Sequence, residues 1–452
     1  MKTDISYDLN NGLRRGARYD SIFFGCFSGG GSTFDIRVRL DLKSDLDIDL
    51  FQRAADEALK CYPEFAVRPV IHGGKICYEQ NLRPVRLYPD NGQRLLFGTD
   101  GVNGTNGYLF VFLYGKRHVT LSLFHGMTDA HGMIAYIITL MWLYMRATHR
   151  IMRFVKPDMF TKHGIRVDSS DYYKMSGRER FDPLSEFAAD IEPIRLIDPD
   201  RMFRLPKEVF SPDDLSCRLI NLEISNKRFL KMTKELGTSF APLLSVFAAE
   251  AIADAYDVGD KTIAVNLTVD PRRQLGTNSF GNMSYNLPLP ITKADLELPL
   301  RELCARLRSD MHRQLTRENA QANFNFILGQ CDQVDAMGDI VAVNKTLNAA
   351  DGVVQLSQTS TIFLTYPGRI AANPISRAVL DGVSPGMLAV ERAIVVYAHK
   401  DSLIIQVTQK SDDMTLADSL YDTLCRHGFE PKKKDMGRVT QNTLELEKLA
   451  RK

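Results

Sequence analysis

Hydrophobic and polar residues follow two alternating patterns in the first third of the chain. Residues 34–42 alternate apolar and polar side chains with a period of two, which predicts a strand, and residues 49–60 change to helical spacing. The apolar runs 108–114 and 117–125 predict a hairpin, and 132–146 predicts a buried helix after it. The chain therefore begins as an alternation of strands and helices.

The same alternation returns in the second half. It predicts mixed sheets covered by helices, an α+β fold, and the sequence carries no glycine-rich motif for binding a nucleotide phosphate. We expect strands at 217–225, 262–270, 285–291 and 360–366, a hairpin at 393–399 and 402–409, and helices at 226–236, 241–256, 294–316 and 415–426.

Chain length predicts two lobes. A single hydrophobic core stops growing at roughly 250–300 residues, and this chain has 452. We expect an N-terminal lobe at 1–165 and a similar C-terminal lobe at 216–435, joined by a crossover linker at 166–215 that is rich in charge and proline. The stretch 436–452 is polar, and we expect it to form a tail on the surface.

Composition and charge narrow the class of partner. Hydrophobic residues make up 44% of the chain and charged residues 25%, which is ordinary for a globular protein. The 57 Lys and Arg nearly balance the 55 Asp and Glu, so no strong field attracts nucleic acid or an anionic membrane. A small molecule is therefore the expected partner.

Cysteine usage and the absence of long apolar segments predict a cytoplasmic protein. The seven cysteines include no CxxC pair, which fits a reducing compartment. The sequence MKTDISYDLNNGLRR lacks the apolar core of a signal peptide, and the apolar stretch Met133–Met145 is shorter than the roughly 17–25 residues that cross a bilayer. We expect no membrane span.

The candidate chemistry centres on His125, at the end of a predicted strand. Val119, Leu121, Leu123 and His125 share one parity, so the imidazole should leave the strand on the apolar side. A partly desolvated imidazole can take a proton from a hydroxyl or an amine, although a histidine here can also be a hydrogen-bonded core residue. Asp129, four residues on, can cap the next helix or pair with an arginine.

A metal site is the other interpretation of this segment. His125, Asp129 and His131 are ligand types that lie close in sequence. The side chains of Asp129 and His131 are two residues apart at the start of a helix and should therefore point in different directions. No further His or Cys lies nearby. We therefore expect no metal.

The segment His125-Gly-Met-Thr-Asp129-Ala-His-Gly resembles the HxxxDG signature of the superfamily that includes chloramphenicol acetyltransferase, peptide-synthetase condensation domains and alcohol acetyltransferases. Three further stretches fall in the family's order: YDLNNGLR, VNLTVDPRRQLGTNSFGNMSYNLPLPI and STIFLTYPGRI. The resemblance spans nearly the whole chain. It implies two chloramphenicol acetyltransferase-like lobes with a tunnel between them and the histidine at its centre.

The resemblance also implies roles for other residues. The family's aspartate faces away from substrate and pairs with an arginine, for which we expect Arg272, with Arg273, Arg14 and Arg15 as alternatives. By family position, the candidates for contacts with the oxyanion or substrate are Asn282, Ser284, Asn286, Thr365 and Tyr366, each of which can also be a structural polar residue.

The chain departs from the family at Ala130, where the signature has glycine. If that position needs a positive φ, alanine would strain the turn by about 1 kcal/mol. Gly132 can compensate, or the departure marks a member that binds without catalysis.

The function implied by the resemblance is transfer of an acyl group from acyl-CoA to a hydroxyl or amine of a small molecule, with His125 as general base. The alternatives are an amide-forming condensation enzyme that uses carrier-protein thioesters and a non-catalytic binding member of the same fold. The sequence does not identify the acceptor or the acyl chain.

Overall fold

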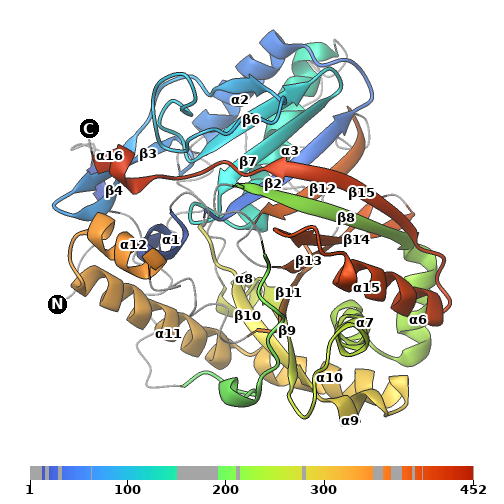
Figure 1. Cartoon of the computed structure of the whole chain (residues 1–452). Helices are drawn as coiled ribbons and strands as arrows, with labels where there is room; N and C mark the ends of the chain where they lie inside the picture. The colour runs from blue at the N-terminus through green and yellow to red at the C-terminus, as the bar shows by residue number, and fades with distance from the viewer. Residues whose placement is uncertain are drawn as a thin grey trace.

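The fold is that of a computed structural model, which describes residues 13–15, 20–28, 33–62, 64–149, 192–209, 214–276, 281–349, 360–367, 379–388, 392–399 and 401–450. Its strands form three sheets, of five, seven and three strands, covered by helices (Figure 1). The α+β class is therefore confirmed. Most of the predicted crossover linker, up to residue 191, lies outside the described residues.

The five-stranded sheet is the centre of the N-terminal lobe, in the order β12-β2-β7-β6-β5. Helices α2 (Ile48–Cys61) and α3 (Ala130–Thr148) pack on one face of it around a shared core. The predicted hairpin is present as β6 and β7. The other strands are β2 (Asp35–Leu42), β5 (Leu87–Pro89), β6 (Phe110–Gly115), β7 (His118–Phe124) and β12 (Leu380–Leu388).

A three-stranded sheet lies beside this lobe, in the order β1-β4-β3. Its strands are β1 (Leu13–Arg15), β3 (Val67–His72) and β4 (Lys75–Gln80), and helix α1 (Asp20–Phe27) follows β1. Two of the alternative arginines, Arg14 and Arg15, are therefore residues of β1, which pairs with β4.

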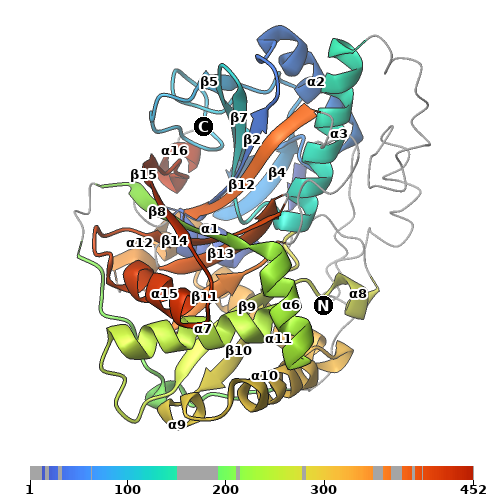
Figure 2. The same ribbon diagram turned by 90° about the vertical axis from the view of Figure 1, so that its right-hand side faces the viewer.

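The seven-stranded sheet forms the C-terminal lobe, in the order β10-β9-β11-β13-β14-β8-β15. Figure 2 shows α6, α7, α10 and α15 gathered against it. The strands are β8 (Ser216–Ser225), β9 (Ile263–Val269), β10 (Tyr285–Ile291), β11 (Ile362–Thr365), β13 (Ala393–His399), β14 (Ser402–Gln409) and β15 (Lys432–Thr440). The long helices are α6 (Asn226–Leu236), α7 (Phe240–Ala255), α10 (Leu300–Gln314), α11 (Arg317–Ala336), α12 (Ile340–Ala349) and α15 (Thr415–Arg426).

The helix predicted at 294–316 is wrong as one element. It divides into α9 (Lys293–Leu296) and α10, with Pro299 as the residue before α10. Proline has no N–H to continue a helix and disfavours a helical residue before it, so the chain restarts at this point. Within the described residues no single helix is long and apolar enough to cross a membrane; α6 and α7 pass that test only as a pair, and they meet at a bend of 100°.

Strand β12 crosses between the lobes. It belongs by sequence to the second half but pairs along its length with β2 of the N-terminal sheet. The assignment of all of 216–435 to the C-terminal lobe is therefore wrong for residues 380–388. The alternation of a strand does not reveal which sheet it joins, because partner choice depends on contacts distant in sequence.

The predicted polar tail is also wrong. Residues up to 440 form β15, which pairs with β8, and the chain then runs to α16 (Leu446–Ala450) beside β3 (Figure 1). We call residues 440–444 the interlobe segment; Gln441, Asn442 and Thr443 in it are fully buried. Their polarity is compatible with burial because they bond to both lobes: Asn442 N donates to Asp35 Oδ2 (2.9 Å) in the N-terminal lobe, and Gln441 Oε1 accepts from Lys410 Nζ (2.9 Å) in the C-terminal lobe.

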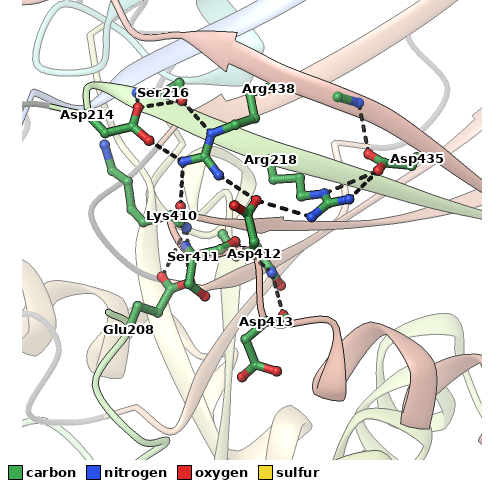
Figure 3. A network of polar contacts seen from close by, with 12 residues as sticks. Glu208, Asp214, Ser216, Arg218, Lys410, Ser411, Asp412, Asp413, Asp435 and Arg438 are labelled. Carbon is green, nitrogen blue, oxygen red and sulfur yellow. Dashed lines mark hydrogen bonds and ion pairs between the residues drawn. The ribbon is translucent and has the colours of Figure 1, made fainter. Parts of the chain in front are cut away.

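Ion pairs hold β15 and β14 to the rest of the C-terminal lobe (Figure 3). Arg438 bonds both Asp214 and Asp412, and Arg218 bonds Asp412 and Asp435. These pairs are largely exposed, so each contributes about 1 kcal/mol or less to stability.

We predict that Asn442→Ala destabilises the whole protein. The side chain accepts from Leu95 N (3.0 Å) and donates to Ser122 Oγ (2.8 Å). Its loss leaves the buried Leu95 N without this acceptor, at about 1–3 kcal/mol, while Ser122 Oγ keeps its bond to Asp35 Oδ1 (2.6 Å). Chemical denaturation measures the change. Lys432→Ala on the exposed part of β15 is the control and should change the free energy of unfolding by less than about 0.5 kcal/mol. Equal stability of the two variants would mean that these bonds do not hold the interlobe segment to the N-terminal lobe.

Candidate functional site

His125 follows β7 directly and is held by backbone bonds. Its N–H donates to Phe34 O (2.9 Å), and the turn after it closes when Met127 N donates to Phe124 O (3.0 Å). The ring atom Nδ1 lies 3.0 Å from Thr128 O. A carbonyl oxygen only accepts, so Nδ1 carries the proton and Nε2 carries the lone pair. The local fold thus selects the tautomer in which Nε2 can act as a base.

Aromatic rings surround the imidazole. The ring of Phe34 lies 4.9 Å and the ring of Phe23 5.7 Å from that of His125, centroid to centroid. Burial lowers the pKa of His125 below its usual value, and the hydrogen bond to Thr128 O and the charge of Asp129 oppose this shift only in part. The imidazole is therefore neutral, and able to accept a proton, at neutral pH.

Gly126 allows this close packing. A Cβ atom at this position would lie 2.5 Å from Cε1 of Phe124 and 2.9 Å from Cβ of Phe23. Helix α1 and the end of β7 therefore approach each other through the space that a side chain would fill. The need for glycine at position 126 therefore arises partly from a segment that is distant in sequence.

Asp129 joins the two lobes through its two carboxylate oxygens. Oδ1 accepts from the N–H groups of His131 (2.9 Å) and Gly132 (3.4 Å), which caps α3. Oδ2 accepts from Met283 N (2.9 Å), just before β10, and lies 2.8 Å from Nη2 of Arg272. The predicted partner arginine is thus the one present.

Arg272 begins the short helix α8 (Arg272–Leu275) after β9 and is almost fully buried. Besides Asp129 it donates to Asp270 Oδ1 (2.9 Å) and to Gly281 O (2.7 Å). The guanidinium therefore links the HxxxD turn of the N-terminal lobe to the turn between β9 and β10. This geometry favours a structural role for Asp129 over a role in the reaction.

Asn282 holds the histidine from the opposite lobe. Its Nδ2 donates to His125 O (3.0 Å) and lies 3.2 Å from Nδ1. Its Oδ1 accepts from the N–H (3.2 Å) and Oγ (2.7 Å) of Ser284. Both ends of the amide are engaged, so the geometry favours a positioning role for Asn282 over an oxyanion contact.

The remaining candidates lie on strand β10, on strand β11 or directly after β11. Asn286 on β10 and Thr365 on β11 are both register partners of Thr268 on β9, and Thr268 Oγ1 donates to Asn286 Oδ1 (3.2 Å). Tyr366 stacks on Phe240 at the start of α7, with ring centroids 4.1 Å apart. The structure thus brings Asn282 to His125 and Ser284 to Asn282, while Tyr366 packs on a helix.

Ala130 is not strained. It is the first residue of α3, and Asn106 is the only non-glycine residue with a positive φ among the described residues. Helical backbone at this position accommodates alanine without cost, so the departure from the family signature does not argue against activity.

His131 has different surroundings from His125. It is 46% exposed and its Nδ1 lies 3.6 Å from Asp270. Across the part of the chain that the structure describes, no group of three or more His, Cys, Asp or Glu is placed to hold a metal ion.

Sequence reasoning missed Phe23, Phe34, Thr128 and Gly126. Thr128 and Gly126 lie inside the motif, and a glycine directly after the histidine was a usable indication of close packing. The two phenylalanines come from segments about 90–100 residues away, which only the fold brings to the histidine.

We predict that Asp129→Asn destabilises the protein, at the lower end of the about 3–5 kcal/mol that losing one partner of a buried ion pair costs, because Arg272 keeps Asp270. Denaturation with urea gives the value. Asp270→Asn is the matched control: Asp270 is half exposed, so its loss should cost less than about 1 kcal/mol. Normal stability of Asp129→Asn together with lost activity would show that Asp129 acts in the reaction.

Gly126→Ala should disturb the site, because Phe124 is fully buried and cannot move aside. Overpacking of this kind costs about 1–3 kcal/mol. A shift of the His125 loop by about 1 Å should slow turnover about 100-fold. Melting curves and initial rates check both effects. Gly329→Ala, in α11 with open space at its Cβ, should leave both unchanged or raise stability slightly; a Gly126→Ala variant that behaves like it would refute the packing argument.

Comparison with known proteins supports the fold. No protein-family model matches the sequence, and no curated protein matches it significantly. Among solved structures, TRI101 of F. sporotrichioides complexed with coenzyme A and T-2 is 13% identical, with a TM-score of 0.58 over 92% of this chain and 98% of that one. The trichothecene 15-O-acetyltransferase TRI3 of Fusarium sporotrichioides is 10% identical, with a TM-score of 0.58 over 91% and 94%.

A third similar structure comes from a different enzyme class. The epimerization domain of the third module of tyrocidine synthetase B is 13% identical, with a TM-score of 0.55 over 92% of this chain and 96% of that one. The matches cover the lobes on both sides of His125. This chain therefore has the two-lobed, chloramphenicol acetyltransferase-like fold.

Proposed function

We propose that the protein transfers an acyl group from acyl-CoA to a hydroxyl or amine of a small molecule, with His125 as general base. The observation that carries the proposal is the bond from Nδ1 to Thr128 O, which leaves Nε2 with its lone pair. The similar structure TRI101 is complexed with coenzyme A, which supports CoA as carrier of the acyl group.

The tautomer with a lone pair on Nε2 determines the steps of the proposed reaction. Nε2 accepts the proton of the acceptor as its oxygen or nitrogen attacks the thioester carbonyl carbon, and the carbonyl electrons move to its oxygen. When the tetrahedral intermediate collapses, the C–S bond breaks and the imidazolium returns the proton to the departing thiolate. No covalent bond to the enzyme forms. The charge of Asp129 favours the transient imidazolium.

The oxyanion needs a hydrogen-bond donor. Ser284, Asn286, Thr365 and Tyr366 are proposed for contacts with the oxyanion or substrate. Ser284 is linked to His125 through Asn282, but its one hydroxyl proton goes to Asn282 Oδ1, so its Oγ fits a substrate contact as an acceptor better than an oxyanion contact. We propose that both substrates reach His125 through a tunnel between the lobes.

The rival function is amide formation from carrier-protein thioesters, which we retain because one similar structure is a domain of tyrocidine synthetase B. Incubation with acetyl-CoA and a panel of alcohols and amines, and separately with acylated carrier protein, distinguishes the two. Turnover with the carrier alone would replace acyl-CoA as the donor. No turnover with either would favour a non-catalytic member.

We predict that His125→Ala slows single-turnover acyl transfer by about 10²–10⁴-fold, the usual contribution of a positioned base. Its fold should persist, because the bonds that hold this turn, from His125 N to Phe34 O and from Met127 N to Phe124 O, are made by the backbone and not by the ring. His131→Ala is the matched control and should lose far less, since this ring is exposed. A fully active His125→Ala would rule out the mechanism, and equal losses would indicate a paired site.

A further inference from the structure

Strand β9 presents its two faces to different surroundings. Ile263, Val265 and Leu267 belong to the core that the helices of the C-terminal lobe share. Side chains alternate along a strand, so Asn266 and Thr268 lie on the opposite face. This is the face that carries the polar residues leading toward His125.

Asn266 has an unusual environment on this face. It is only 1% exposed, and within the described part of the chain neither its amide nitrogen nor its amide oxygen has a hydrogen-bond partner. Native proteins pair nearly all such groups, because a buried unpaired amide has lost its water without replacement. Two unpaired atoms on one side chain indicate a partner other than the described residues of the chain.

The neighbours of Asn266 on this face are less buried than Asn266 itself. By strand register it lies between Pro288 on β10 and Phe363 on β11, and both are half-buried. Two residues along β9, Thr268 is also half-buried. A ligand on this face would therefore meet Asn266 at its deepest point.

A line of polar residues connects Asn266 to the histidine. Asn282 contacts His125, Ser284 bonds to Asn282, and Asn286 follows on β10 opposite Thr268. With a rise of about 3.4 Å per residue, Asn266 lies about 7 Å beyond Thr268 along the strand. That spacing suits one ligand extending from the reacting centre along the sheet.

We propose that Asn266 binds a ligand group that both donates and accepts a hydrogen bond, a hydroxyl or a secondary amide. A primary amide offers one acceptor oxygen and one donor nitrogen, which such a group satisfies together. This inference rests on the proposed function and assigns a specificity-determining residue to the same site. The group has two sources: an amide of the pantetheine arm of CoA, or a second polar group of the acceptor.

The substitution Asn266→Leu tests the inference because it should weaken ligand binding without lowering the stability of the free protein. Removing an unpaired buried amide should leave the melting temperature of the free protein unchanged or raise it. The same change should weaken ligand binding about tenfold or more, seen as CoA affinity by calorimetry or as KM for an acceptor found in the alcohol and amine panel. Lower CoA affinity identifies the pantetheine amide, and a raised KM for the acceptor alone identifies the acceptor.

Asn221→Leu is the matched control. Asn221 lies on β8 of the same sheet, four strands from β9, and its Oδ1 accepts from Gln406 Nε2 (3.0 Å). Its loss should lower the melting temperature and leave CoA affinity and KM unchanged.

Three results would overturn the inference. A fall in melting temperature for Asn266→Leu like that of Asn221→Leu would show that protein or water already satisfies the amide. Unchanged affinity and KM in an active Asn266→Leu would show that no ligand contacts it. Wild-type protein that neither binds CoA nor transfers acyl groups would refute the proposed function, and this inference with it.

Discussion

The site depends on one buried carboxylate. Asp129 receives four donors, two from the first turn of α3 and two from the C-terminal lobe, and its charge is balanced by Arg272. A buried ion pair is stable only when its geometry is well satisfied, so the two lobes can approach in one arrangement. That arrangement brings Asn282 against His125 and holds the imidazole in position, while Thr128 O selects its tautomer.

The rest of the fold maintains the same approach. One hydrophobic core contains residues from both lobes, among them Phe124 of β7 and Leu267 of β9. Strand β12 and the interlobe segment each cross from the second half of the sequence into the N-terminal lobe. A large apolar interface with two crossing segments makes independent motion of the lobes costly. The site is thus built between two parts that behave as one body.

The sequence predicted what depends on local pattern and on motif. The α+β class, the hairpin before His125 and the pairing of Arg272 with Asp129 all follow from period, turn residues and family resemblance. It did not predict the burial of Asn442 or the sheet that β12 joins, because both depend on partners hundreds of residues away. It also missed the packing at Gly126, since composition gives no contact distance.

The central claim is that a neutral His125, held between the lobes, takes the proton of the acceptor. The pH dependence of single-turnover acyl transfer tests it most directly, in wild-type protein saturated with acyl-CoA. Burial lowers the pKa of His125, so the base stays active at neutral pH and is lost only as the pH falls through a value below the usual histidine pKa of about 6.5. A rate that falls already above that value, or that does not fall at acid pH while the protein stays folded, would contradict the account.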